Sequence, residues 1–155
     1  MNNVEWTPEW LTETIKLLRT HGSDTQFIEV KKAHGGYPGS LDATLSSFSN
    51  SSTGGIIICG LDENNDFAPV GVYDPADLEK TLGNKLRRGL KPPNTMESGT
   101  ILYEGTKIFV ATIPPLPPYE RPAYIGGKAY VRSGDGDHEM SRHETCLLYT
   151  SPSPR

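Results

Sequence analysis

An apolar run without polar alternation limits the folds open to this chain. Residues 56–58 are isoleucines, Cys59 follows them, and the paired glycines Gly54 and Gly55 precede them. A strand with one exposed face alternates apolar and polar residues, whereas a strand buried on both faces does not. We therefore expect residues 56–61 to form a buried central strand. No Gly-Lys-Ser/Thr or Gly-x-Gly-x-x-Gly motif accompanies the two glycines, so a tight turn explains them better than a phosphate loop.

The patterns around this strand predict both helices and strands. Thr7 and Pro8 favour a helix start, and Gly22 a stop, with apolar residues at helical spacing between them. The later patterns predict a strand over 27–33, a helix after Ser40, the central strand, a helix from Asp74 to about Gly89, a hairpin of residues 100–103 and 107–113, and a strand over 128–132. We predict an α+β fold in which helices pack on a mixed β-sheet, in the order strand-helix-strand-helix, then a β-hairpin and a further strand.

Length and composition favour one domain. The 155 residues, 35% of them hydrophobic, suffice for one core and are too few for two comfortable ones. We expect an N-terminal helix within residues 1–22 and a domain over residues 23–145. Residues 147–155 turn to Ser and Pro, and we interpret them as a translated sequencing-adapter tail on a C-terminally truncated fragment, or else as a natural disordered tail.

Charge and cysteine content narrow the function classes. The formal charge of −4 and pI of about 5.5 give no overall basic footprint, so contacts with nucleic acid require a local patch. We find neither a signal peptide nor an apolar span, and expect a cytoplasmic protein without membrane contact. Cys59 and Cys146 fit no metal spacing or disulfide framework, and Cys59 is interpreted as a small buried hydrophobe.

An acidic set with one lysine is the best chemical site. Glu29 and Lys31 are two apart in a predicted strand and so share a face, with Asp24 before them and Asp62 after the central strand. Carboxylates can hold a divalent cation, Mg²⁺ or Mn²⁺, while an ammonium steadies charge on a phosphate. If these groups catalyse, we expect the three carboxylates to converge on one ion beside Lys31. An ordinary surface ion pair is the alternative, and no cofactor is certain.

A cationic cluster is the second candidate. Lys85, Arg87, Arg88 and Lys91 crowd the end of the predicted helix, where cations bind phosphates or complement the helix dipole. For a nucleic-acid surface they should be continuous with Lys31 and Lys32, and with Arg132. The acids and histidines at positions 135, 137, 138, 139 and 143 fit no metal loop and are interpreted as a solvated connector.

Several short motifs in a fixed order resemble a known family. They are Glu29-Val-Lys31, Leu-Ser-Ser-Phe48-Ser-Asn50, Gly54-Gly55-x4-Gly60-x-Asp62, Val70-Gly71-Val72, Arg121-Pro122-x-Tyr124 and Tyr130-Val-Arg132-Ser-Gly134. Together they resemble the Schlafen-type AlbA-like domain over about residues 23–145. The resemblance implies a DNA-binding or RNA-binding regulatory domain, and it places Asp24, Glu29 and Asp62 with Lys31 where nuclease-active Schlafen proteins carry their carboxylates.

We therefore predict a domain that binds nucleic acid, either DNA or structured RNA. The first alternative is a divalent-metal-dependent endoribonuclease that uses Asp24, Glu29, Lys31 and Asp62. The second is a protein-interaction or homo-oligomerisation module that uses a sheet edge and the first helix.

Overall fold

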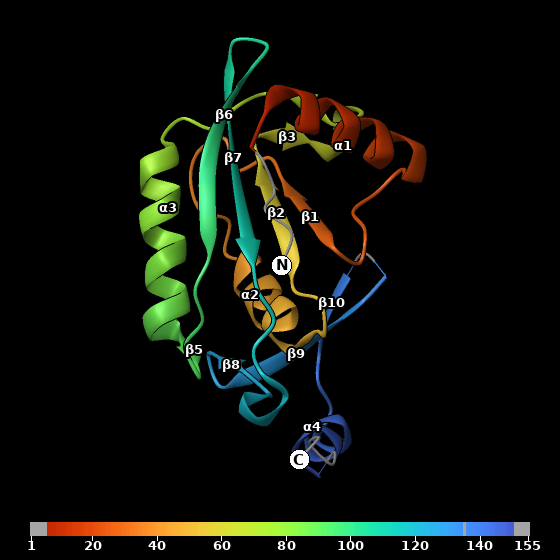
Figure 1. The fold of residues 1–155 in the computed structure, drawn as a ribbon, viewed down its shortest axis with the longest axis vertical. Helices are drawn as coiled ribbons and strands as arrows, with labels where there is room; N and C mark the ends of the chain where they lie inside the picture. The colour runs from red at the N-terminus through yellow and green to blue at the C-terminus, as the bar shows by residue number, and fades with distance from the viewer. Residues whose placement is uncertain (1–5, 135, 151–155) are drawn as a thin grey trace.

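The computed structural model describes residues 6–134 and 136–150 of the chain (Figure 1). Its helices are α1 (Pro8–His21), α2 (Leu41–Asn50), α3 (Pro75–Asn84) and α4 (Arg142–Thr150), with short helical turns η1 (Glu63–Asn65), η2 (Lys85–Gly89) and η3 (Pro118–Glu120). Its strands are β1 (Ile28–Lys31), β2 (Gly55–Cys59), β3 (Leu61–Asp62), β4 (Ala68–Pro69), β5 (Leu90–Lys91), β6 (Glu97–Tyr103), β7 (Thr106–Ile113), β8 (Tyr124–Ile125), β9 (Lys128–Ser133) and β10 (Gly136–Glu139). The predicted α+β class is confirmed.

The main sheet has the order β1-β2-β7-β6. β1 pairs in parallel with β2, placing Glu29 opposite Ile57, while β7 is antiparallel to both β2 and β6. Of the predicted central strand, Ile57, Ile58 and Cys59 are fully buried and Ile56 is half-buried. Gly60, with a φ of 114°, ends β2 before β3 begins, so the predicted strand over 56–61 is two shorter strands.

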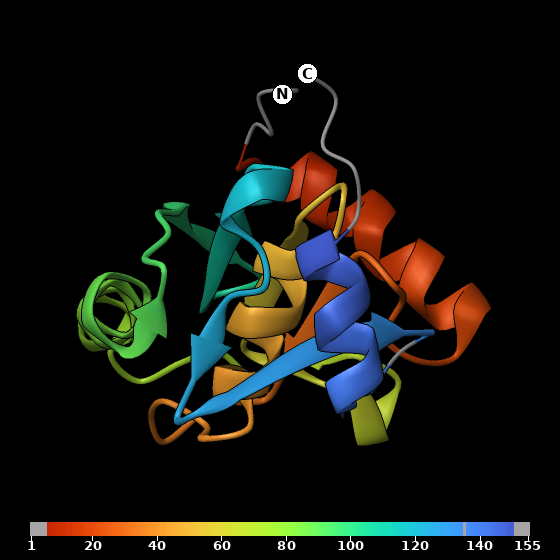
Figure 2. The ribbon, with the colours of Figure 1, turned by 90° about the horizontal axis from the view of Figure 1, so that it is seen from below.

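A second sheet, of order β10-β9-β8-β5, covers the other side of α2. Figure 2 shows β9 crossing α2. The strand predicted over 128–132 is therefore present, as β9, but it belongs to this second sheet. Burial between two sheets explains why the residues at positions 44–50 of α2 are all buried although only two of them, Leu45 and Phe48, are apolar.

Side chains of β2 and β7 alternate between two cores. Ile57, Cys59 and Phe109 belong to the α2 core, which also contains the apolar residues of α2 and α3. Ile58 and Val110 point to the other face and belong to the α1 core, together with Leu11, Ile15 and Leu18 of α1. The main sheet therefore lies between α1 on one face and α2 with α3 on the other (Figures 1 and 2).

Local sequence signals explain the helix boundaries. Thr7 caps α1 by accepting a hydrogen bond from the Trp10 N–H, and Gly22 ends the helix in the left-handed region. Asp74 caps α3 by accepting from the Asp77 N–H. Ser40 precedes α2 but makes no capping bond through its side chain.

Gly54, just before β2, and Gly55, its first residue, are both required by packing. Gly54 has a φ of 71°, and a Cβ there would collide with the carbonyl oxygen of Ile113. A Cβ at Gly55 would lie 2.5 Å from the Phe48 ring. The predicted structural role of these glycines agrees with this packing.

The C-terminal residues differ from the prediction. α4 includes Leu147–Thr150, so the first four residues of the expected tail continue a helix, and residues 151–155 lie outside the described part. None of the described helices is both long and apolar enough to span a bilayer. Cys59 is a buried free thiol, and burial raises its pKa to about 12, in keeping with its expected role as a buried hydrophobe.

Candidate nucleic-acid interface and buried carboxylate site

Glu29 is a buried carboxylate on β1. Its side chain is 5% exposed, and its Oε1 accepts hydrogen bonds from Arg132 Nη1 at 2.6 Å and from Thr44 Oγ1 at 3.3 Å. Lys31, on the same face of β1, places its Nζ 3.6 Å from Glu29 Oε2. The predicted proximity of Glu29 and Lys31 is confirmed, but Glu29 also forms a salt bridge with Arg132 of β9.

Arg132 lies inside the protein, which corrects its assignment as a phosphate contact. Its side chain is 2% exposed, Nη2 donates to the carbonyls of Thr25 and Ile28, and the guanidinium lies over the Phe48 ring. Its remaining donor, Nε, is buried without a partner among the described residues. A guanidinium enclosed in this way holds β1, α2 and β9 together and is not available to a nucleic acid.

Asp137 on β10 completes the cluster. Its Oδ1 accepts from Arg132 Nη1 at 3.1 Å and from Ser47 Oγ at 2.5 Å, and its Oδ2 accepts from Thr44 Oγ1 at 2.7 Å. Sequence reasoning took Asp137 for part of a connector and did not identify Thr44 or Ser47. Asp135, from the same stretch, lies outside the described residues.

Asp24 adjoins Glu29 and carries a proton. Burial, followed by the neighbouring carboxylates of Glu29 and Glu63, raises the pKa of Asp24 to about 10. Burial disfavours ionised Glu29 as well, but hydrogen bonds from Asp24 and Arg132 and the charges of Arg132 and Lys31 outweigh this and lower its pKa. The pair therefore consists of a neutral acid that donates to a carboxylate.

Asp62 does not join this pair. Its Oδ1 caps η1 by accepting from the Asn64 N–H, and its Oδ2 lies 3.9 Å from Lys32 Nζ. Within residues 6–134 and 136–150, no three or more His, Cys, Asp or Glu side chains are grouped so as to hold a metal ion. The predicted gathering of Asp24, Glu29 and Asp62 is not found in this conformation, and Glu29 is already bound to Arg132. The nuclease alternative remains a prediction without support from this geometry.

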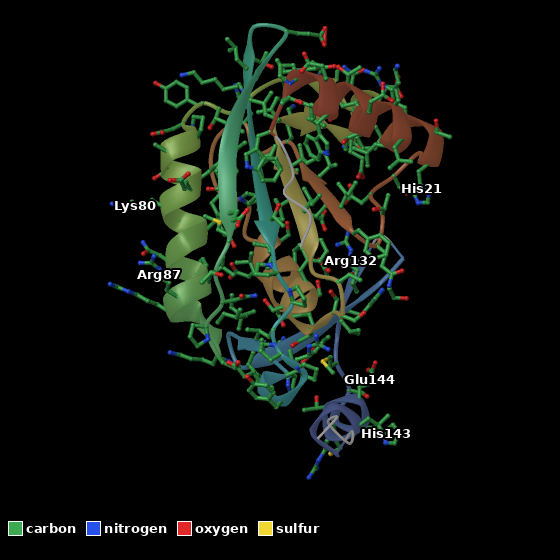
Figure 3. The ribbon with its side chains drawn as sticks, viewed as in Figure 1. His21, Lys80, Arg87, Arg132, His143 and Glu144 are labelled. Atoms are coloured by element: carbon green, nitrogen blue, oxygen red, sulfur yellow. The ribbon has the colours of Figure 1, made fainter. Side chains whose placement is uncertain are left out.

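The cationic cluster lies where α3 changes into η2, a π-helical turn. Residues 80–91 contain five lysines and arginines and no carboxylate, and we call them the cationic segment. Lys80, which sequence reasoning did not include, is exposed and lies two turns before Arg87. Figure 3 shows both side chains projecting on the side of the molecule away from α1. π-helical turns occur often at functional sites.

The cations of this segment differ in their exposure and in whether they form ion pairs. Lys85 binds Asp42, with Nζ 3.2 Å from Oδ2, and lies over the Tyr37 ring. Within the described part of the chain, Lys80, Arg87, Arg88 and Lys91 are exposed and make no ion pair. Lys31, the last residue of β1, and Lys32, which follows it, have carboxylate partners. The continuity of these two lysines with the cationic segment remains a prediction.

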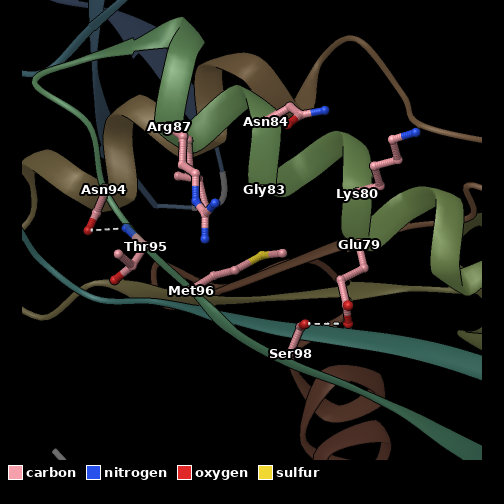
Figure 4. Close-up of a pocket in the computed structure, with 10 residues that line it drawn as sticks. Glu79, Lys80, Gly83, Asn84, Arg87, Asn94, Thr95, Met96 and Ser98 are labelled. Carbon is pink, nitrogen blue, oxygen red and sulfur yellow. Dashed lines mark hydrogen bonds between the residues drawn. The ribbon is translucent and has the colours of Figure 1, made fainter.

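A hollow of about 340 Å³ lies beside the cationic segment, between α3 and the start of β6 (Figure 4). On the helix side it is lined by Glu79, Lys80, Gly83, Asn84 and Arg87, and on the strand side by Thr95, Met96 and Ser98. Gly83 leaves room for the Met96 side chain, 4.0 Å from the position that a Cβ would take. The arrangement offers cations and amide and hydroxyl groups around a shallow space.

This geometry defines an α+β domain with a buried carboxylate–arginine cluster and one exposed cationic segment. The family model described as "Schlafen, AlbA_2" matches residues 24–141, most of the chain. The chain belongs to this family, and the predicted resemblance is confirmed. No curated protein matches its sequence.

Solved structures share the fold. One is the solution structure of the N-terminal domain of a "Putative ATP-dependent DNA Helicase RecG-related Protein" from Nitrosomonas europaea, with a TM-score of 0.64 and 24% identity over 85% of this chain and 95% of that one. Another is the crystal structure of the DIP2311 protein from Corynebacterium diphtheriae, with a TM-score of 0.58 and 15% identity over 95% of this chain. The match spans 29% of the DIP2311 chain. At these identities the likeness shows the fold alone.

Proposed function

We propose that this chain is a DNA-binding domain that contacts the phosphate backbone through the cationic segment. The observation that carries the proposal is the local charge: five cations and no carboxylate within residues 80–91 of a chain whose net charge is −4. Four of these cations are exposed and free of ion pairs among the described residues. A patch of this kind is the electrostatic footprint of phosphate binding.

The comparisons support DNA as the partner. The Nitrosomonas europaea domain is named as part of a DNA helicase-related protein, and it has the same fold. The family assignment agrees with a role in nucleic-acid binding. The buried position of Arg132 limits the proposed contact surface to the cationic segment, with Lys31 and Lys32 as further candidates.

Charge reversal tests this proposal. We expect the double variant Arg87→Glu, Arg88→Glu to weaken binding of fluorescently labelled DNA at least tenfold, measured by anisotropy, because it replaces two phosphate contacts with two repulsions. The matched control is Lys16→Glu with Lys128→Glu, which changes the net charge equally at two exposed sites elsewhere. If both double variants bind DNA equally well, the cationic segment is not the contact surface.

A further inference from the structure

We propose that the groove between α3 and β6 binds single-stranded DNA, with phosphates held by cations of α3 and η2 and a base stacked on Tyr73. The inference rests on the proposed function. It adds that the DNA is single-stranded and that it continues along the groove from the cations to Tyr73. Its starting point is that the hollow in Figure 4 does not end at Glu79. A neighbouring hollow of about 450 Å³ shares Glu79 and extends to Tyr73, Pro75, Thr100 and Lys107.

Tyr73 has the exposure that base stacking requires. Its side chain is 86% exposed, more than any other large hydrophobic residue in the described part of the chain. The backbone beneath it is fixed, because the Val72 N–H donates to the carbonyl oxygen of Lys107 and the Tyr73 N–H donates to the carbonyl oxygen of His34. An aromatic ring held at a groove mouth provides a platform for one base, and such stacking tolerates any base.

The charges along the groove separate a phosphate side from a base side. Lys80 lines it from α3, Arg87 lines it from η2, and Lys107 lies at the Tyr73 end. Asp74, whose Oδ1 accepts from the Asp77 N–H, also lines that end and belongs with Glu79 to the side that repels phosphate. Between the cations, Glu79 Oε2 accepts a hydrogen bond from Ser98 Oγ at 2.9 Å (Figure 4). A carboxylate repels phosphate but accepts hydrogen bonds from base amino groups. The strand is therefore expected to keep its backbone on the cations and turn its bases toward Glu79 and Ser98.

The size of the two hollows favours a single strand over a duplex. Cavities of a few hundred Å³ accommodate groups of the size of a base or a nucleotide. In a duplex the bases are paired and stacked on each other, so their faces are not offered to a protein ring. Only an unpaired strand satisfies the cations and the tyrosine together.

The test compares the binding of single-stranded and duplex DNA, of about twelve nucleotides per strand, to the whole chain by fluorescence anisotropy. We expect tighter binding of the single strand, and a loss of about tenfold for Tyr73→Ala on the single strand only. Tyr73→Phe should retain binding because it keeps the ring. Tyr119→Ala, which removes another highly exposed tyrosine on η3, is the matched control.

The outcomes separate this inference from the proposed function. Salt-dependent DNA binding that is lost in Arg87→Glu, Arg88→Glu but unchanged in Tyr73→Ala would overturn the single-strand inference and leave the proposed function standing. Equal or tighter binding of the duplex would do the same. Absence of binding to either form by the unmodified protein would overturn both. Circular dichroism of each variant confirms that the fold is retained.

Discussion

Asp24 makes the stability of this protein depend on pH in the direction opposite to that of a carboxylate whose pKa is lowered by folding. The folded protein keeps a proton on Asp24, whose pKa is raised to about 10 by burial and by Glu29 and Glu63. The unfolded chain releases that proton above the ordinary value of 3.8. Unfolding thus releases a proton in this range, and the stabilisation is lost as the pH rises toward the folded pKa. Glu29 has the opposite sign, because its lowered pKa removes stability only as the pH falls.

Asp24→Asn isolates this effect, since an amide is neutral and can still donate to Glu29. Between roughly pH 6 and 9, we expect the free energy of unfolding of the unmodified protein to fall relative to that of the variant, by up to about 1.4 kcal/mol per pH unit. Urea unfolding at several pH values measures the difference. Parallel pH profiles for the two proteins would show that Asp24 is ionised in the folded state.

Arg132 illustrates the cost of removing one member of a buried charge cluster. Arg132→Met removes the buried guanidinium that Glu29 and Asp137 share, and we expect a loss of about 3–5 kcal/mol in the free energy of unfolding. Arg142→Met, at the exposed start of α4, is the control and should change stability by less than about 0.5 kcal/mol. Adding Glu29→Gln to Arg132→Met should cost less than the sum of the two single changes, because the residues interact directly. Additive losses in denaturant unfolding would contradict the coupling.

At the scale of elements, the junction of α2 and β2 is fixed by close contact. Gly55→Ala places a Cβ 2.5 Å from the Phe48 ring, so we expect a loss of about 3 kcal/mol from overpacking. Gly39→Ala is the matched control, since no atom lies within 4 Å of the Cβ position there. Thermal unfolding followed by circular dichroism compares the two, and equal melting temperatures would mean that Phe48 moves aside freely.

Helix α1 is an integral part of the domain although all of it precedes the family match at residues 24–141. Leu18 is fully buried in the α1 core, whereas Leu17 beside it is 56% exposed. We expect Leu18→Ala to cost about 2–5 kcal/mol and Leu17→Ala less than about 0.5 kcal/mol. Similar losses for both leucines in urea unfolding would show that α1 is not docked as described.

The elements that carry local signals were predictable, and the tertiary contacts of the site were not. Caps at Thr7 and Asp74 and the apolar spacing of α1 and α3 act within a few residues, and so does the Glu104-Gly105 turn, where both residues have positive φ. Two-residue strands such as β5 and β8 are too short to show a periodicity. Glu29 and Arg132 are 103 positions apart, so no spacing rule could pair them. Tyr73 was missed because a lone aromatic residue in sequence does not reveal its exposure.

Over the whole molecule, the cationic segment is a local positive patch on a chain whose net charge is −4. Because DNA binding through this patch consists of contacts between cations and phosphates, it should depend steeply on salt. The four exposed cations Lys80, Arg87, Arg88 and Lys91 allow about four phosphate contacts, which predicts a slope of about −3 for log affinity against log salt on a single strand. Lys91→Gln should flatten this slope by about 0.7, whereas Lys16→Gln on α1 should leave it unchanged. Anisotropy titrations at several salt concentrations measure the slope, and a value near zero would rule out phosphate contacts.

The alternation of β2 and β7 side chains between two cores also determines how the molecule unfolds. Ile57 and Ile58 are neighbours in sequence, yet one packs with α2 and the other with α1. If either helical layer separated, it would expose apolar side chains of β2 and β7, and these same strands also pack against the other layer. We therefore expect the layers to unfold as one cooperative unit, and DNA bound beside α3, as proposed above, should stabilise α1 on the opposite face of the sheet without touching it.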